Sequence, residues 1–146
     1  MMGESGCGKT YLSEFVSECL LEDKMKELTL YSGVTELDFI RFMIEAVQEA
    51  KLLKEKGKNL WVFFDEFNTS SLQSIVAEIM IDRVCSIEPS IYHIPQNMIF
   101  ISCCNPFRMK TKRAEVGLVP KTSDTILSHR VYPIPERLLN YIWDFG

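Results

Sequence analysis

The sequence predicts an α/β fold in which helices cover a parallel β-sheet, and three observations support this. Two apolar runs, "LWVFF" at residues 60–64 and "MIFISCC" at 98–104, are typical of strands buried on both faces. Segments with helical spacing of apolar residues alternate with such runs along the chain. The chain also opens with a glycine-rich stretch, "GESGCGKT" at residues 3–10, directly before a helical segment.

The composition is that of a globular protein of one domain, which we expect to occupy residues 1–146. Hydrophobic residues make up 47% and charged residues 25% of the chain, as in ordinary globular proteins. The net charge of −4 favours neither a nucleic acid nor an anionic membrane as a partner. No apolar run approaches the roughly 18–20 residues of a transmembrane segment. The five cysteines lack C-x-x-C spacing, which favours reduced thiols in a cytoplasmic protein.

In the first half of the chain, a helix is predicted from Thr10 to about residue 21, and a strand over "LTLYSG" at residues 28–33. Thr35 is a candidate cap for the next helix, which we expect to end near Gly57. The residues expected on its buried face are Leu37, Ile40, Ile44 and Val47.

In the second half, the strand at residues 60–64 precedes a helix that begins near Ser70 and Ser71. The apolar residues of this helix are Leu72, Ile75, Val76, Ile79 and Met80. A loop is expected around residues 89–95, before the strand at 98–104, and another over the polar residues 109–128. "RVYPIP" at residues 130–135 is predicted to form a final short strand, limited in length by its prolines.

The glycine-rich stretch matches the phosphate-binding pattern G-x-x-x-x-G-K-[ST] at each specified position. Its glycines permit a tight turn and leave backbone N–H groups open to phosphate oxygens. Lys9 can reach the β- and γ-phosphates, and the Thr10 hydroxyl can ligate Mg²⁺. The predicted nucleotide-binding residues are Gly3, Glu4, Ser5, Gly6, Cys7, Gly8, Lys9 and Thr10. The alternative is a glycine-rich turn that merely precedes a helix.

An acidic pair follows the apolar run at residues 60–64, at the strand end where open α/β sheets bind ligands. We expect Asp65 to hold the Mg²⁺ shell and Glu66 to act as general base on the attacking water. The alternative is that the two acidic residues simply end a strand at a solvated turn.

Three further polar residues are candidates for the same site. Asn105 follows the strand at 98–104 and can hydrogen-bond the γ-phosphate or the lytic water, although an Asn-Pro turn explains it equally well. Arg130 and Arg83 are candidates for a phosphate contact, with a surface or salt-bridged arginine as the alternative for each. His93 and His129 show no metal-ligand spacing.

Five stretches occur in the order "GESGCGKT", "FFDEFNTS", "EIMIDR", "CCNPFR" and "HRVYPIPERLLNYIWDFG". In this combination the chain resembles, over residues 3–146, one AAA+ module of the mysterin-type giant RING-finger E3 ubiquitin ligases. Asn68, two places after the acidic pair, also resembles the dynein and midasin branch of AAA+ proteins. The resemblance implies a P-loop NTPase (AAA+) fold that binds ATP and Mg²⁺.

The resemblance also implies roles for individual residues. It implies a Walker A motif at residues 3–10, a Walker B motif at 60–66 and sensor 1 at Asn105, and it makes Arg130 a candidate arginine finger. Because AAA+ ATPases bind nucleotide between adjacent modules, neighbouring AAA+ modules in the same chain or a ring are the implied partners. A link to the ubiquitin machinery would come through the larger protein, since no RING-like cysteine and histidine cluster occurs here.

Two elements of the AAA+ pattern have no counterpart in this sequence. One is the central strand ahead of the phosphate loop, where only Met1 and Met2 stand, and the other is the helical lid after Gly146. We therefore expect a truncated fold, from a fragment or partial gene model of a larger protein, with unpaired edges on the neighbouring strands.

ATP hydrolysis is the leading prediction, and two other functions stay open. One is a structural module that binds ATP with little turnover, and the other is a small P-loop kinase. The kinase is less favoured because Glu66 suits water activation and no acceptor-site signature is present. A GTPase is disfavoured because the guanine-reading motif [NT]-K-x-D does not occur.

Overall fold

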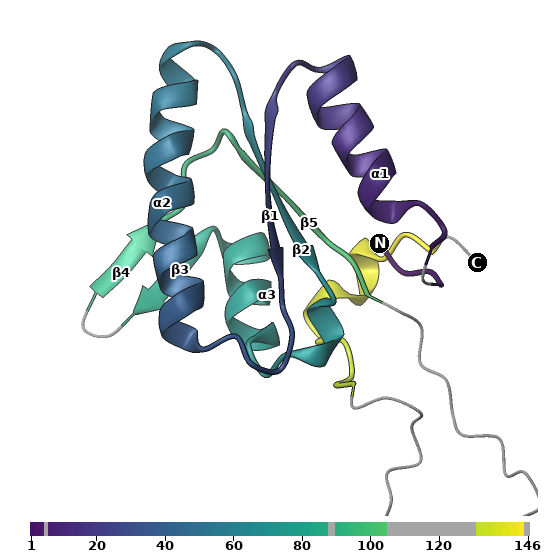
Figure 1. Cartoon of the computed structure of the whole chain (residues 1–146). Helices are drawn as coiled ribbons and strands as arrows, with labels where there is room; N and C mark the ends of the chain where they lie inside the picture. Colours follow the sequence, from purple (N-terminus) through teal and green to yellow (C-terminus); the bar gives the residue numbers. More distant parts are fainter. Residues whose placement is uncertain (5, 88–89, 105–130, 145–146) are drawn as a thin grey trace, which may run out of the picture.

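The computed structural model describes residues 1–4, 6–87, 90–104 and 131–144. At its centre is a parallel sheet of order β1-β2-β5, formed by β1 (Lys24–Thr29), β2 (Leu60–Asp65) and β5 (Met98–Ser102). All three strands run in the same direction, so their carboxyl ends lie at one edge of the sheet (Figure 1). The strands predicted at residues 60–64 and 98–104 are both confirmed, the second ending two residues earlier. The predicted burial holds for β2, whereas most of β5 is only half-buried.

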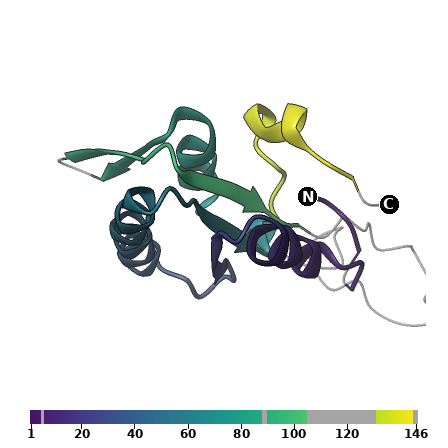
Figure 2. The ribbon, with the colours of Figure 1, turned by 90° about the horizontal axis from the view of Figure 1, so that it is seen from above.

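Helices flank this sheet on two sides. The first begins as α1 (Lys9–Glu14) and continues as a π-helical segment, η1 (Phe15–Leu20). It lies on one side, whereas α2 (Glu36–Glu55) and α3 (Gln73–Asp82) lie on the other (Figures 1 and 2). The predicted α/β fold is therefore confirmed.

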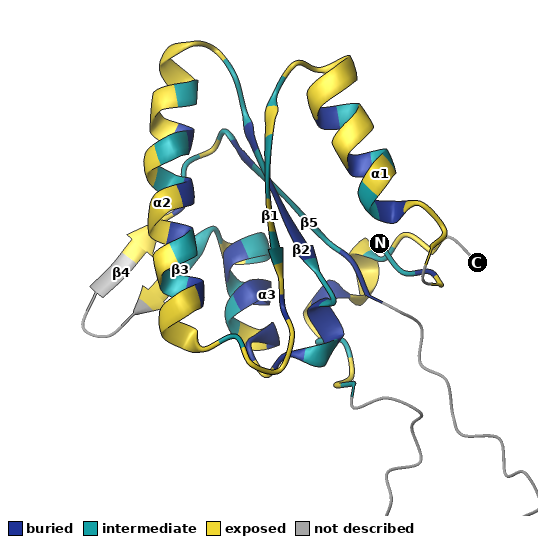
Figure 3. Cartoon of the chain, viewed as in Figure 1, coloured by how far each residue is buried: buried dark blue, intermediate teal, exposed yellow. Residues whose placement is uncertain are grey.

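The main hydrophobic core lies between β2 and the helices α2 and α3 (Figure 3). Burial of large side chains there is close to complete, and each removes apolar surface from water. Its members include Phe39, Met43, Leu60, Val62, Phe64, Val76 and Ile79. Phe64 packs against Phe39 with ring centroids 5.7 Å apart and stacks on Phe100 of β5 at 6.1 Å. This core fixes the end of β2, which carries the acidic pair.

The first strand is displaced from its predicted position at residues 28–33. In the structure β1 pairs with the whole of β2, from Lys24 opposite Leu60 to Thr29 opposite Asp65. The strand was not predicted at this position because it contains charged residues instead of an apolar run. One of them, Lys26, pairs with Glu45 of α2 at 3.0 Å.

The helix α2 confirms its predicted ends but not its predicted buried face. Thr35 caps it, and its hydroxyl accepts a hydrogen bond from the Asp38 N–H at 3.2 Å. Gly57 follows the helix with a φ of 69°, which glycine adopts without strain. The residues buried in the structure are Phe39, Met43, Ala46 and Ala50. Leu37 and Ile44, which we expected to be buried, are 66% and 44% exposed.

Two further predictions are corrected, and one lies outside the described residues. An antiparallel hairpin, β3 (Val84–Ile87) and β4 (Ser90–His93), replaces most of the loop expected around residues 89–95. Residues 131–135 form no strand and lead into a 3₁₀ helix, η3 (Glu136–Tyr141). The loop predicted at residues 109–128 lies outside the described residues.

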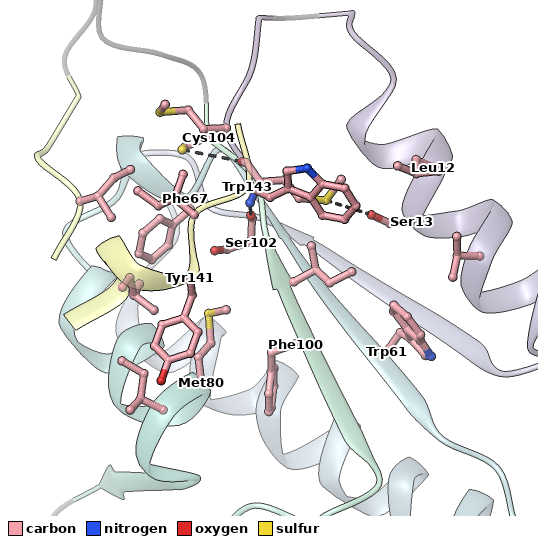
Figure 4. Close-up of a pocket in the computed structure, with 18 of the residues that line it drawn as sticks. Leu12, Ser13, Trp61, Phe67, Met80, Phe100, Ser102, Cys104, Tyr141 and Trp143 are labelled. Atoms are coloured by element: carbon pink, nitrogen blue, oxygen red, sulfur yellow. Dashed lines mark hydrogen bonds between the residues drawn. The ribbon is translucent and has the colours of Figure 1, made fainter. Parts of the chain in front are cut away.

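An apolar cleft of about 570 Å³ runs beside β5. Figure 4 shows Leu12 and Ser13 of α1 on one side of it, with Met80 and Tyr141 on the other. On either side of β5, the Asn97 carbonyl accepts the Leu60 N–H and the Cys103 N–H donates to the Phe64 carbonyl. The backbone groups of the odd-numbered residues therefore point toward β2, and those of the even-numbered residues point away from it. The backbone groups of Phe100 and the Ser102 N–H therefore face the cleft, and they have no hydrogen-bond partner among the described residues.

Candidate phosphate-binding site

The glycine-rich loop has the backbone geometry that its sequence predicts. Gly6 and Gly8 have φ values of 83° and 89°, in the left-handed region that side chains rarely enter. A Cβ atom at either position would meet no neighbouring atom, so the requirement for glycine comes from the backbone angle rather than from crowding. Immediately after Gly8, α1 begins at Lys9.

Lys9 turns back into its own loop. Its ammonium donates to the carbonyl oxygens of Gly3 at 2.8 Å and Glu4 at 2.9 Å, and it lies 3.6 Å from the Cys7 sulfur. The residue is only 8% exposed. The loop thus surrounds a positive charge, and a phosphate group would compete with its carbonyl oxygens for that charge.

Backbone hydrogen bonds attach the start of the loop to the carboxyl end of β5. The amino group of Met1 donates to the Ser102 carbonyl at 2.7 Å, and the Cys104 N–H donates to the Met1 carbonyl at 3.1 Å. The Gly3 N–H in turn donates to the Cys104 carbonyl at 3.3 Å. These bonds form a short parallel ladder, so the loop begins at the strand end where ligands of α/β sheets bind.

The acidic pair lies at the same edge of the sheet. Asp65 is the last residue of β2, and one of its carboxylate oxygens accepts the Glu66 N–H at 2.9 Å. Burial raises the pKa of the neighbouring Cys103 thiol to about 12, and the charges of Asp65 and Lys9 both act on this thiol. Asp65 and Lys9 are therefore both near enough to this buried cysteine for their charges to act on it.

Glu66 opens a tight turn whose importance the sequence did not indicate. Its φ of 51° is unusual for a residue with a side chain, and a short 3₁₀ segment, η2 (Phe67–Thr69), follows it. The Phe67 N–H donates to the Cys103 carbonyl at 2.9 Å, and the Tyr132 N–H donates to the Asn68 carbonyl at 2.7 Å. This turn is thus joined both to β5 and to the segment after residue 130.

The candidate Mg²⁺ ligands are oxygen donors, which suit this ion. Thr10 offers a hydroxyl and Asp65 a carboxylate, and both residues are half-buried. Within the ranges that the structure describes, no group of three or more histidine, cysteine, aspartate or glutamate residues could hold a metal ion. A Mg²⁺ held by Thr10 and Asp65 would take phosphate and water oxygens for the rest of its shell, as is common for nucleotide-bound Mg²⁺.

Four predicted site residues remain, and the structure describes one of them, Arg83. Ser5, Asn105 and Arg130 lie outside the described residues. Arg83 lies near the opposite end of β5, where its guanidinium donates to the Met98 carbonyl at 2.8 Å and to the Pro95 carbonyl at 2.5 Å. It also lies over the Phe100 ring, 5.1 Å from the centroid. These contacts support a structural role for Arg83.

The fold and this loop define the class as an α/β P-loop NTPase fold. The model of the family described as "RNF213 AAA domain" matches residues 1–108, and the chain belongs to that family. RNF213 is another name for mysterin, so the resemblance drawn from the sequence motifs is confirmed.

Curated relatives are similar along the whole chain. It is 30% identical to E3 ubiquitin-protein ligase RNF213 of Mus musculus and 29% identical to E3 ubiquitin-protein ligase rnf213-beta of Danio rerio. The Homo sapiens RNF213 ligase is 28% identical. Each alignment covers 100% of this chain but 3% of the relative, so the chain spans a small part of these proteins. Among the described helices, none is both long and apolar enough to cross a membrane.

Proposed function

We propose that this chain binds ATP with Mg²⁺ and hydrolyses it, as one AAA+ module of a large RNF213-like protein. The observation that carries the proposal is the joining of the Lys9 loop to the carboxyl end of β5, beside the end of β2 that bears Asp65 and Glu66. A cationic lysine and two carboxylates at one sheet edge suit a nucleotide with bound Mg²⁺, because the lysine can bind phosphate and a carboxylate can bind the metal.

Nucleotide binding would begin with an exchange of partners at Lys9. The ammonium now held by the Gly3 and Glu4 carbonyls would turn to the β- and γ-phosphates. The left-handed glycines keep the loop backbone free of side chains, so its N–H groups can approach the same oxygens. Bound Mg²⁺ would offset phosphate charge, and Thr10 and Asp65 are the residues that would hold it.

Hydrolysis would then depend on Glu66. Glu66 is half-buried, and no hydrogen bond or ion pair of its carboxylate occurs among the described residues. It is therefore available to accept a proton from a water that attacks the γ-phosphate. Asn105 would orient this water or the γ-phosphate, and Arg130 would stabilise developing charge in an adjacent module.

A structural module that binds ATP with little turnover is the second candidate. The backbone groups of Phe100 and the Ser102 N–H, which have no partner among the described residues, favour it, because an incompletely paired sheet holds catalytic groups less rigidly than a fully paired one. The two candidates share every residue of the loop and differ in the fate of bound ATP.

The wider setting is also proposed. We take residues 1–146 as the core of one module, which would work with neighbouring AAA+ modules in a cytoplasmic protein. Ubiquitin ligase activity, named for the relatives, would belong to the larger protein rather than to this module.

Calorimetric titration with ATP, with and without Mg²⁺, and a phosphate-release assay test this proposal. We expect ATP to bind more tightly when Mg²⁺ is present and phosphate to be released. ATP binding without phosphate release would favour the structural module, and a folded chain that binds no ATP would contradict both candidates.

A further inference from the structure

Thr69, the last residue of η2, contacts two backbone carbonyls near the turn at Glu66. Its hydroxyl oxygen lies 2.7 Å from the carbonyl oxygen of Leu30 and 3.0 Å from that of Glu66. Its N–H also donates to the Glu66 carbonyl, at 2.9 Å. Leu30 directly follows β1, so this side chain joins the turn after β2 to the end of the neighbouring strand.

The residue that Thr69 contacts has an unfavourable backbone conformation. Glu66 has a φ of 51°, which costs free energy for any residue with a Cβ atom and persists only where the surroundings enforce it. Backbone hydrogen bonds hold the residues on either side of Glu66. The Phe67 N–H donates to the Cys103 carbonyl, and the Asp65 carbonyl accepts the Leu30 N–H. The Thr69 hydroxyl adds a side-chain bond that a substitution can remove without changing the backbone.

We propose that Thr69 is a positioning residue that holds Glu66 in its left-handed conformation and thereby sets the direction of the Glu66 carboxylate. The consequence for catalysis rests on the proposed function, in which Glu66 activates water. The conformational part does not, since it concerns only the bonds among Thr69, Glu66 and Leu30. Loss of the hydroxyl should therefore affect turnover much more than ATP affinity.

The first test removes and then restores the hydroxyl, with amide hydrogen exchange as the readout. Thr69→Val keeps the shape of the side chain, Thr69→Ser keeps its hydroxyl, and Ser71→Ala is the control at an exposed neighbouring residue. We expect exchange over residues 66–69 to rise by up to about tenfold in Thr69→Val, the effect of one hydrogen bond. Thr69→Ser and Ser71→Ala should exchange like the wild type. Unchanged exchange in Thr69→Val, or no rescue by serine, would overturn the proposal.

The second test asks whether the effect acts through Glu66. Glycine adopts a positive φ without cost, so Glu66→Gly should make Thr69→Val nearly silent in exchange and in melting temperature. If Thr69→Val alone does not fold, the double variant should fold. If Thr69→Val raises exchange and lowers the melting temperature equally in the wild-type and Glu66→Gly backgrounds, Thr69 is a general packing residue and the proposal is refuted.

Turnover separates this inference from the proposed function. We expect Thr69→Val to lower ATP hydrolysis about tenfold, with ATP affinity within about twofold of the wild type. If Glu66→Gln lowers turnover but Thr69→Val does not, Thr69 does not position the base. If Glu66→Gln leaves turnover unchanged, the proposed role of Glu66 fails, and the exchange experiments still decide whether Thr69 holds the turn.

Discussion

The Lys9 ammonium lies 2.8 Å from the carbonyl oxygen of Gly3, the first residue of its own loop. The same charge is therefore the internal partner of the loop and the group expected to meet phosphate. Lys9→Ala should abolish measurable ATP binding, since no other cation of the loop can replace it. Calorimetric titration with Mg·ATP checks this, and Lys51→Ala on the exposed face of α2 is the matched control. Retained affinity in a folded Lys9→Ala variant would rule out this role.

Glu66→Gln should have the opposite profile. Its amide can neither accept the proton of water nor repel the γ-phosphate, so ATP should still bind. Hydrolysis should fall by roughly 10²-fold or more, as when a general base is lost. Titration and phosphate release measured on the same preparation give both quantities. Equal loss of ATP binding in Glu66→Gln and Lys9→Ala would sink this division of roles.

The carboxylate of Asp23 should make stability depend on pH. It accepts the Asn59 N–H at 2.8 Å and the Trp61 indole N–H at 3.0 Å. Burial by itself would raise the pKa of Asp23, but these hydrogen bonds and the charge of Lys58 outweigh it and lower the pKa below the usual 3.8. The folded state therefore gains stability above about pH 4 and loses it as the pH falls through the lowered pKa.

Asp23→Asn tests this sign. The difference in unfolding free energy between wild type and variant should be largest near neutral pH and shrink below pH 3.8. Denaturant titrations at several pH values measure it, with the exposed Glu18→Gln as control. A difference that stays constant down to strong acid would mean that packing, not charge, makes Asp23 important.

A strand added before Met1 should stabilise the chain. Met1 and Gly3 already form a parallel ladder with residues 102–104, and the open groups of Phe100 and Ser102 continue its line. We expect the chain alone to unfold in a broad transition, and about six apolar residues ahead of Met1 to sharpen it and raise the melting temperature. An extension of equal length with alternating prolines is the control. A sharp, reversible transition in the chain without any extension would contradict this.

The sequence predicted those elements in which one physical signal dominates. The strands at β2 and β5 are continuous apolar runs, and Thr35 and Gly57 mark helix ends by local chemistry. The prediction from sequence misplaced β1, because this edge strand contains Lys24 and Lys26 instead of an apolar run. Its position is set by pairing with β2, which the local sequence does not reveal. The hairpin was missed because β3 and β4 are short and separated by a proline.

At the candidate site, the sequence predicted residue types and their chain order but not their conformations. The pattern of residues 3–10 predicted a tight glycine turn, and the structure achieves it with left-handed conformations at Gly6 and Gly8. Nothing in "DEFNTS" predicts a positive φ at Glu66 or the contact of Thr69 with Leu30, because both depend on a strand distant in sequence. The roles of Lys9, Asp65 and Glu66 stay predictions until nucleotide binding is measured.

Arg130 is predicted to act on the nucleotide of an adjacent module. It lies outside the described residues, but the segment that follows it is anchored by the bond from the Tyr132 N–H to the Asn68 carbonyl, at 2.7 Å. An arginine finger stabilises charge on the departing phosphoryl group, an effect of about 10³–10⁵ in rate when fully engaged. Arg130→Ala should therefore lower hydrolysis in the neighbouring module and barely change ATP affinity in its own. The rival interpretation is a structural cation paired with Glu136.

The experiment for Arg130 needs a polypeptide that carries several modules. Combining Arg130→Ala with Lys9→Ala assigns the remaining turnover, because Lys9→Ala silences the pocket of this module alone. If Arg130 is a finger, the double variant should lose turnover beyond that of Lys9→Ala, at an unchanged melting temperature. Arg137→Ala is the control, since its guanidinium pairs with Asp82 at 2.6 Å. If Arg130→Ala lowers only the melting temperature and turnover per folded molecule stays constant, the arginine is structural and no finger.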